Sequence, residues 1–134
     1  MVPEGITTDM GYSSLRDLVM GQATGINFGG LSFSEPTLLN KCFPPAQAGL
    51  YAILILDVRF GPRPYRSIYF GQAEDLSERV NASHEKYPCW RGKAGAAGLY
   101  ASFCPLYSST KLARQVLEAN LIKQYQPACN VQGR

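Results

Sequence analysis

The sequence predicts an α+β fold: a small three-stranded antiparallel sheet flanked by helices. Residues 49–60 and 65–71 are apolar and rich in β-branched or aromatic side chains, and a third such segment, 98–104, follows a helical pattern. The order β-β-α-β-α has too few strands for a parallel doubly wound sheet. At 134 residues, one domain should bury roughly two-thirds of the surface of its unfolded chain, and we expect no second independent domain.

The start of the chain predicts an extension of helix and loop. Apolar residues at helical spacing over 8–21 indicate a short helix. The stretch 25–48 is rich in Gly, Ser and Pro, which predicts a loop containing one short strand or turn. We therefore expect an N-terminal extension over 1–48, of unknown role, and a compact domain over 49–134.

The first two predicted strands form a hairpin. Residues 49–60 are apolar on both faces, as expected of a central strand. The connection to 65–71 contains two prolines and a glycine, which predicts an irregular loop. Arg59, Arg63 and Arg66 make this loop basic.

Two helices complete the domain. Asp75 and Glu78 have the offset of a capping box, which predicts a helix over about 76–83 with Asp75 accepting backbone N–H groups at its start. The longest helical pattern covers 108–125, begins with serine and threonine caps, and stops before Pro127.

Composition narrows the class of protein. With 46% hydrophobic and 17% charged residues, the chain is typical of a soluble globular protein. No apolar run approaches a membrane span, and the N-terminus lacks the features of a secretory signal, so we expect a cytoplasmic protein without a membrane partner. The net charge of +3 is compatible with a polyanionic partner but does not identify one. The four cysteines contain no C-x-x-C pair, and one histidine cannot complete a typical zinc set, which predicts buried free thiols.

Five polar features stand out against this scaffold. Gly-Leu-Tyr at 49–51 opens the first strand, and Tyr-Phe-Gly at 69–71 closes the second. Arg79 lies in the first helix, ten residues after the start of the second tripeptide, Glu118 lies inside the last helix, and Asn130 follows the proline turn. This pattern resembles the GIY-YIG nuclease family, whose two tripeptides match with one conservative middle substitution each.

The resemblance covers residues 49–131. The closing stretch LEANLIKQYQPACNV is especially similar to that of the family domain in the bacterial excision-repair incision subunit. The resemblance implies a GIY-YIG-like fold and a metal-dependent endonuclease that hydrolyses DNA phosphodiester bonds. DNA repair, restriction, mobile-element and toxin-like roles all stay open, because fold analogy does not choose among them.

The resemblance also implies roles for the matched residues. Glu118 would hold Mg²⁺ (or Mn²⁺), which needs only one carboxylate because it keeps most of its waters. The forked donors of Arg79 would hold the phosphoryl oxygens. Tyr51 and Tyr69 would activate water, with either as the base, and Asn130 would tie the segment after the helix to the site. One such site cuts one strand, so double-strand cleavage would need a homodimer or sequential nicks.

Each residue has a structural interpretation when taken alone. Tyr51 and Tyr69 are typical half-buried strand aromatics, and Asn130 is a common turn residue. In the family a histidine or tyrosine usually follows the helix arginine by four residues, which is Ser83 here. His84 comes one residue later, and it either reaches the site from the helix end or lies on the surface.

The charged residues have similar alternatives. Arg79 lies four residues after Asp75 and could pair with it on the helix. Glu118 lies four residues after Arg114, in the less favourable orientation for a helix ion pair. Five coincidences at the family's spacing favour a shared nuclease site. The alternative function is a catalytically silent GIY-YIG-like nucleic-acid-binding module.

Basic residues outside the pattern are candidates for DNA contact. Tyr87, Trp90, Arg91 and Lys93 form a predicted basic and aromatic loop that could stack on bases and bind phosphates, although core packing explains Trp90 equally well. The expected nucleic-acid-binding residues are Arg59, Arg63, Arg66, Arg91 and Lys93.

Overall fold

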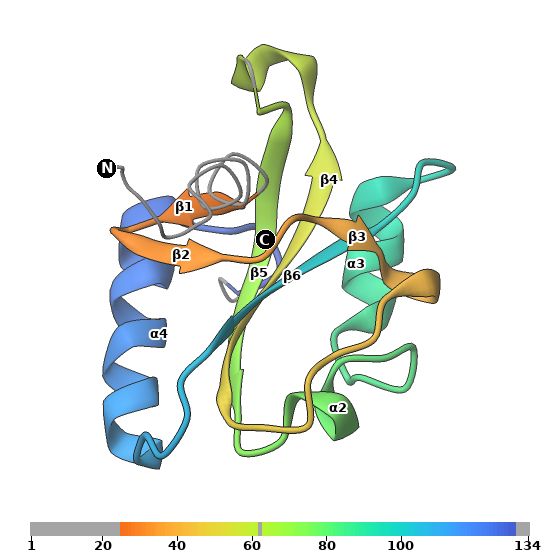
Figure 1. Ribbon diagram of the computed structural model, residues 1–134. Helices are drawn as coiled ribbons and strands as arrows, with labels where there is room; N and C mark the ends of the chain where they lie inside the picture. Colours follow the sequence, from red (N-terminus) through yellow and green to blue (C-terminus); the bar gives the residue numbers. More distant parts are fainter. Residues whose placement is uncertain (1–24, 62, 131–134) are drawn as a thin grey trace, which may run out of the picture.

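The computed structural model describes residues 25–61 and 63–130, and its centre is a four-stranded antiparallel sheet of order β3-β6-β4-β5 (Figure 1). The strands are β3 (Thr37–Leu38), β6 (Tyr100–Pro105), β4 (Gly49–Leu56) and β5 (Tyr65–Ala73). A separate hairpin consists of β1 (Ile26–Phe28) and β2 (Leu31–Phe33). The α+β class is confirmed. The three-stranded sheet is wrong, because β3 adds a fourth strand beside β6.

The described helices are α2 (Leu76–Arg79), α3 (Tyr87–Ala94) and α4 (Lys111–Tyr125), with 3₁₀ turns η2 (Leu39–Lys41) and η3 (Val58–Phe60). Asp75 caps α2 as predicted by accepting from the Ser77 N–H at 3.0 Å. This helix ends at Arg79 rather than at residue 83, because Val80 takes an extended conformation. The helix predicted over 8–21 lies outside the described residues. Among the helices of 25–61 and 63–130, none has the length and apolarity needed to cross a bilayer.

Residues 87–94 form a helix where the sequence predicted a loop. Pro88 occupies the first turn of α3, where a missing N–H breaks no helical hydrogen bond. Gly95 ends α3 with a φ of +60°, a conformation that glycine adopts without strain. The prediction for α4 is confirmed, and its Thr110 cap accepts from the Ala113 N–H at 3.1 Å.

The two faces of the sheet are covered by different helices (Figure 1). One face, here called the α2/α3 face, carries α2 and α3, and the opposite α4 face carries α4 and the β1–β2 hairpin. Successive residues of β4 point alternately into the two cores, so this strand is buried on both sides. The α2/α3 core includes Tyr51, Ile53, Leu76, Val80 and Trp90, and the α4 core includes Leu50, Ala52, Leu54, Phe70 and Leu121.

The segment predicted as a loop supplies part of the α4 core. Phe28 and Phe33 of the β1–β2 hairpin are buried and meet Phe70 edge to face, with ring centroids 5.2 and 6.2 Å away. Strands of two or three residues are too short for alternation to be recognised in the sequence.

Two of the cysteines form a disulfide. Cys89 of α3 and Cys129, forty residues apart, are joined with their Cα atoms 5.9 Å apart. The prediction of free thiols is wrong for this pair and correct for Cys42 and Cys104. Spacing along the chain carried no sign of the bond, because a disulfide depends on Cα positions that only the tertiary fold sets.

Candidate functional site

The candidate site lies at the free edge of β5. Because β5 is the last strand of the sheet, its outward backbone groups need partners from elsewhere. The C-terminal part of the chain supplies them: the Cys129 N–H donates to the Ile68 carbonyl at 2.9 Å, and the Gln72 backbone hydrogen-bonds to the Glu118 carboxylate. The residues beyond the long helix are therefore tied to the strand that carries Tyr69.

Asn130 makes the most specific of these edge contacts. Its Oδ1 accepts from the Phe70 N–H at 2.7 Å, and its Nδ2 donates to the Phe70 carbonyl at 2.8 Å. The side-chain amide thus imitates a neighbouring strand at the centre of the second tripeptide. Asn130 thus ties the segment after α4 to the backbone of β5.

Tyr51 and Tyr69 lie side by side on the α2/α3 face. Tyr51 pairs with Gly71 across the β4–β5 ladder, and Tyr69 pairs with Ile53, so both tyrosines point to one face with ring centroids 6.0 Å apart. Gly71 is required by this arrangement, because a Cβ there would lie 2.7 Å from Tyr51 Cε1 and closer still to its Cζ and Oη. The glycine of the second tripeptide therefore makes room for the tyrosine of the first.

A register shift lies directly before Tyr69 in β5. The ladder pairs Ile53 with Tyr69 but Leu54 with Ser67, which leaves Ile68 as an extra residue in β5. Such a bulge changes the face to which the following side chains point, and bulges are frequent next to active sites. The Ile68 carbonyl is the group that accepts from Cys129.

His84 reaches the tyrosine pair, which decides between the two alternatives left by the sequence. Its Nε2 lies 2.7 Å from Tyr51 Oη, and its Nδ1 accepts from the Lys86 N–H at 2.9 Å. Burial, assisted by the charge of Arg79, lowers the pKa of His84 to about 4, so the imidazole is neutral at pH 7. Because Nδ1 is an acceptor, the single ring proton is on Nε2 and is donated to Tyr51.

This donation leaves the Tyr51 hydroxyl proton for another acceptor. The neighbouring Tyr69, whose ring centroid lies 6.0 Å from that of Tyr51, is placed to receive it. Burial raises the pKa of both tyrosines, and that of Tyr51 lies far above its usual value. Tyr51 is 0% exposed, so it is shielded from direct contact with a substrate.

Trp90 of α3 packs against His84 and Tyr69. Its ring centroid lies 4.5 Å from that of His84 and 5.5 Å from that of Tyr69, and the residue is 0% exposed. Core packing is therefore its role, and stacking on nucleic acid is excluded in this conformation.

Arg79 extends from the end of α2 toward the tyrosines. Its guanidinium donates to both carboxylate oxygens of Glu85, at 2.8 and 2.6 Å, and also hydrogen-bonds to Tyr51. The pairing with Asp75 suggested by the helix spacing is wrong, because Asp75 is used as the cap of α2. Glu85 was not recognisable as a partner of Arg79 from the sequence, since a separation of six residues is no helical pair spacing.

Glu118 approaches the same strand from α4. Burial raises its pKa, while the Gln72 hydrogen bond and the charge of Arg79 act in the opposite direction. Arg114, its predicted helix partner, is almost fully buried and donates to Gln72 Oε1 at 3.0 Å and to the Ser109 carbonyl at 2.7 Å. The helix ion pair therefore does not account for Glu118.

A cavity of about 450 Å³ opens beside these residues, between α2 and α4. It is lined by Gln72, Ala73, Glu74, Asp75, Glu78, Arg79, Lys111 and Arg114. Lys111 was not singled out from the sequence, because nothing in its neighbourhood distinguishes it from other lysines at the start of a helix.

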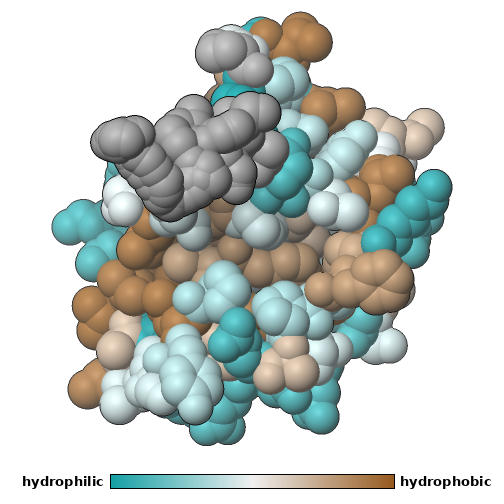
Figure 2. Space-filling view, viewed as in Figure 1, coloured by the Kyte–Doolittle hydropathy of each residue, from teal (hydrophilic) through white to brown (hydrophobic). Residues whose placement is uncertain are grey.

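The basic hairpin lies at the opposite end of the sheet from α2 (Figure 1). Arg59 and Arg66 pair with Asp57, at 2.7 and 3.4 Å, and Arg63 pairs with Glu35 at 2.7 Å. These carboxylates offset most of the positive charge that the sequence suggested. Apolar side chains accompany the arginines at this tip, where Val58 is 88% and Phe60 48% exposed. The β4–β5 connection lies at the top of the view, where Figure 2 shows hydrophobic surface.

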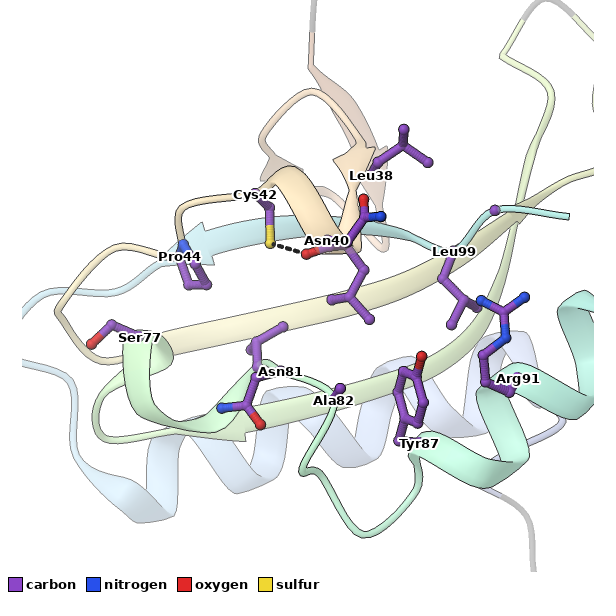
Figure 3. Close-up of a pocket in the computed structure, with 13 residues that line it drawn as sticks. Leu38, Asn40, Cys42, Pro44, Ser77, Asn81, Ala82, Tyr87, Arg91 and Leu99 are labelled. Atoms are coloured by element: carbon purple, nitrogen blue, oxygen red, sulfur yellow. Dashed lines mark hydrogen bonds between the residues drawn. The ribbon is translucent and has the colours of Figure 1, made fainter.

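Arg91 and Lys93 lie on α3. Arg91 donates to the Gly95 and Ala97 carbonyls at 2.7 and 2.9 Å, so it closes the C-terminal end of its own helix. It also lines a second cavity of about 450 Å³ between α3, the α2–α3 connection and residues 38–44 (Figure 3). None of the residues predicted to take part in catalysis lines this second cavity.

The chain is similar to solved structures of a nuclease domain. No family model matches the chain, and no curated protein matches it. Among solved structures, a crystal structure of the GIY-YIG N-terminal endonuclease domain of UvrC from Thermotoga maritima, bound to its catalytic magnesium, is 28% identical. The alignment covers 66% of this chain and 88% of that domain, with a TM-score of 0.45. A point mutant of the same domain, bound to its catalytic divalent cation, is 27% identical with the same coverage and a TM-score of 0.45. The chain is similar to this domain over the aligned residues.

Proposed function

We propose that the protein is a metal-dependent endonuclease of the GIY-YIG type that hydrolyses DNA phosphodiester bonds at the free edge of β5. The cluster of His84, Tyr51 and Tyr69, in which the His84 hydrogen bond to Tyr51 lies beside the Tyr69 ring, carries the proposal. The charges of Glu118, Glu85 and Arg79 all act on the pKa of Tyr69, so the influence of carboxylates and of a cation converges on its hydroxyl. Packing alone requires no such convergence.

Tyr69 is the general base in this proposal, and Tyr51 is its positioning residue. Since Tyr51 Oη already accepts from His84, its proton can be donated to Tyr69, where it would stabilise a Tyr69 phenolate rather than a Tyr51 phenolate. Neutral His84 fixes this direction because its only ring proton is already given to Tyr51. Arg79, permanently charged, stabilises both the phenolate and the phosphoryl oxygens.

Glu118 would hold the divalent cation. The described residues contain no group of three or more His, Cys, Asp or Glu able to enclose a metal. A single half-buried carboxylate fits Mg²⁺, which keeps most of its waters, better than an ion that needs a closed protein cage. Such a cation would neutralise charge on the phosphoryl oxygens and cancel the negative charge of Glu118 that raises the pKa of Tyr69.

Nicking of supercoiled plasmid by the purified chain, with Mg²⁺ or with EDTA, tests the activity. We expect cleavage only with Mg²⁺ and its loss in Glu118→Gln, whose amide oxygen can still accept from Gln72. Full activity of Glu118→Gln would refute the metal-anchor role. Plasmid binding without cleavage in the unmodified protein would favour the silent binding module.

The tyrosines are tested by single-turnover rates of their phenylalanine variants. Tyr69→Phe should lower the rate by about 10²–10⁴-fold, the range for a general base, and Tyr51→Phe should lower it less. The double variant should be little slower than Tyr69→Phe alone, because the two hydroxyls act in one chain. A larger loss from Tyr51→Phe than from Tyr69→Phe would contradict the assigned direction.

A further inference from the structure

Arg79 and Glu85 face each other fork to fork. Two parallel hydrogen bonds, Nη1 to Oε1 at 2.8 Å and Nη2 to Oε2 at 2.6 Å, use the terminal donors of the guanidinium. A carboxylate and a phosphate present two oxygens to an arginine in the same bidentate way. Glu85 therefore occupies the donors that a phosphate would use.

The position of Glu85 is fixed by its neighbours. His84 is buried against Tyr51, and the Lys86 N–H donates to His84 Nδ1, so the backbone is held on both sides of Glu85. The Tyr87 N–H donates to the His84 carbonyl at 3.0 Å and closes the turn. The carboxylate is thus presented to Arg79 by the same turn that orients the tyrosines.

We propose that Glu85 is an internal competitor of the substrate phosphate: it holds the Arg79 guanidinium in the free protein and is displaced when a nucleic-acid phosphate binds. This inference rests on the proposed function, since it takes Arg79 as the phosphate ligand. The exchange replaces one anionic partner of Arg79 by another. The Glu85 side chain is 59% exposed, so the released carboxylate returns to water.

The competition operates throughout the pH range of an assay. Arg79 holds the pKa of Glu85 at about 2, so the carboxylate stays charged and mild acid cannot remove it. An exposed ion pair is weak enough for a phosphate to displace. Glu85 therefore lowers the affinity for substrate without blocking the site.

The test is fluorescence anisotropy of a labelled duplex oligonucleotide in EDTA, where binding is measured apart from cleavage. Glu85→Gln should bind about two- to fivefold more tightly than the unmodified protein, as expected for loss of one exposed competing pair. Glu78→Gln is the matched control. It also removes one negative charge near Arg79, in this case from α2, and it leaves the Arg79–Glu85 pair in place. The gain of Glu85→Gln should exceed that of the control and disappear in an Arg79→Ala background.

The outcomes separate this proposal from the proposed function. Weaker binding by Arg79→Ala with no gain from Glu85→Gln over Glu78→Gln would keep Arg79 as the phosphate ligand and overturn the competition. Weaker binding by Glu85→Gln would show that Glu85 aligns Arg79 for the substrate, which also overturns it. Unchanged binding by Arg79→Ala would show that Arg79 is not the phosphate ligand, which overturns the competition as well. Binding by Glu85→Gln where the unmodified protein binds nothing would be the strongest support.

Discussion

Replacing Gly71 by alanine should damage both stability and activity, because the Tyr51 ring occupies the space of the new methyl group. The Cβ would lie 2.7 Å from Tyr51 Cε1, so the ring must move away from His84. Overpacking costs about 1–3 kcal/mol, and an unmade buried hydrogen bond costs a further ~1–3 kcal/mol. The lower conformational entropy of alanine offsets about 0.5–1 kcal/mol. We expect a net loss of about 1–5 kcal/mol in the free energy of unfolding.

Urea denaturation followed by circular dichroism measures this loss, and the single-turnover rate should fall at least about 10-fold. Gly92→Ala is the control, since nothing lies within 4 Å of a Cβ at this position of α3. The control should keep its rate and gain up to about 1 kcal/mol from helix propensity. Equal stability and rate for Gly71→Ala and the unmodified protein would refute the contact between the two tripeptides.

Three further predictions concern pH, reduction and salt. The pKa of His84 is about 4 in the folded protein against 6.5 for an ordinary histidine, so the unfolded chain binds the proton more readily. The free energy of unfolding should therefore be at its full value above pH 6.5 and fall by up to about 1.4 kcal/mol per pH unit toward pH 4. Urea titrations of His84→Gln at the same pH values should lack this slope. Reducing the disulfide between Cys89 and Cys129, which are 40 residues apart, should lower the unfolding free energy by about 2–4 kcal/mol, whereas Cys129→Ser should be insensitive to dithiothreitol. Replacing Arg59 and Arg63 by alanine should flatten the salt dependence of DNA affinity by about one log–log unit per lost phosphate contact; an unchanged slope would place DNA elsewhere.

The sequence by itself determined the elements whose signals are local. The apolar run of β4, the Thr110 cap and the helical spacing of α4 depend on residues near in sequence, and all three were predicted. The two tripeptides and Glu118 were recognisable because their spacing along this chain matches that of the family pattern. For residues 25–48 the sequence predicted a loop with one short strand or turn, whereas the structure has the β1–β2 hairpin and β3, since strands of two or three residues carry too little periodicity.

Only the tertiary structure decided which side chains meet. Arg79 had Asp75 at helical spacing, yet it pairs with Glu85, because α2 ends at Arg79 and the following turn brings Glu85 to the guanidinium. The same turn places His84 against Tyr51, a contact between residues 33 positions apart. Such partners are set by the packing of α2 and α3 on the sheet. This packing depends on contacts between residues far apart in the sequence, which no local sequence pattern reveals.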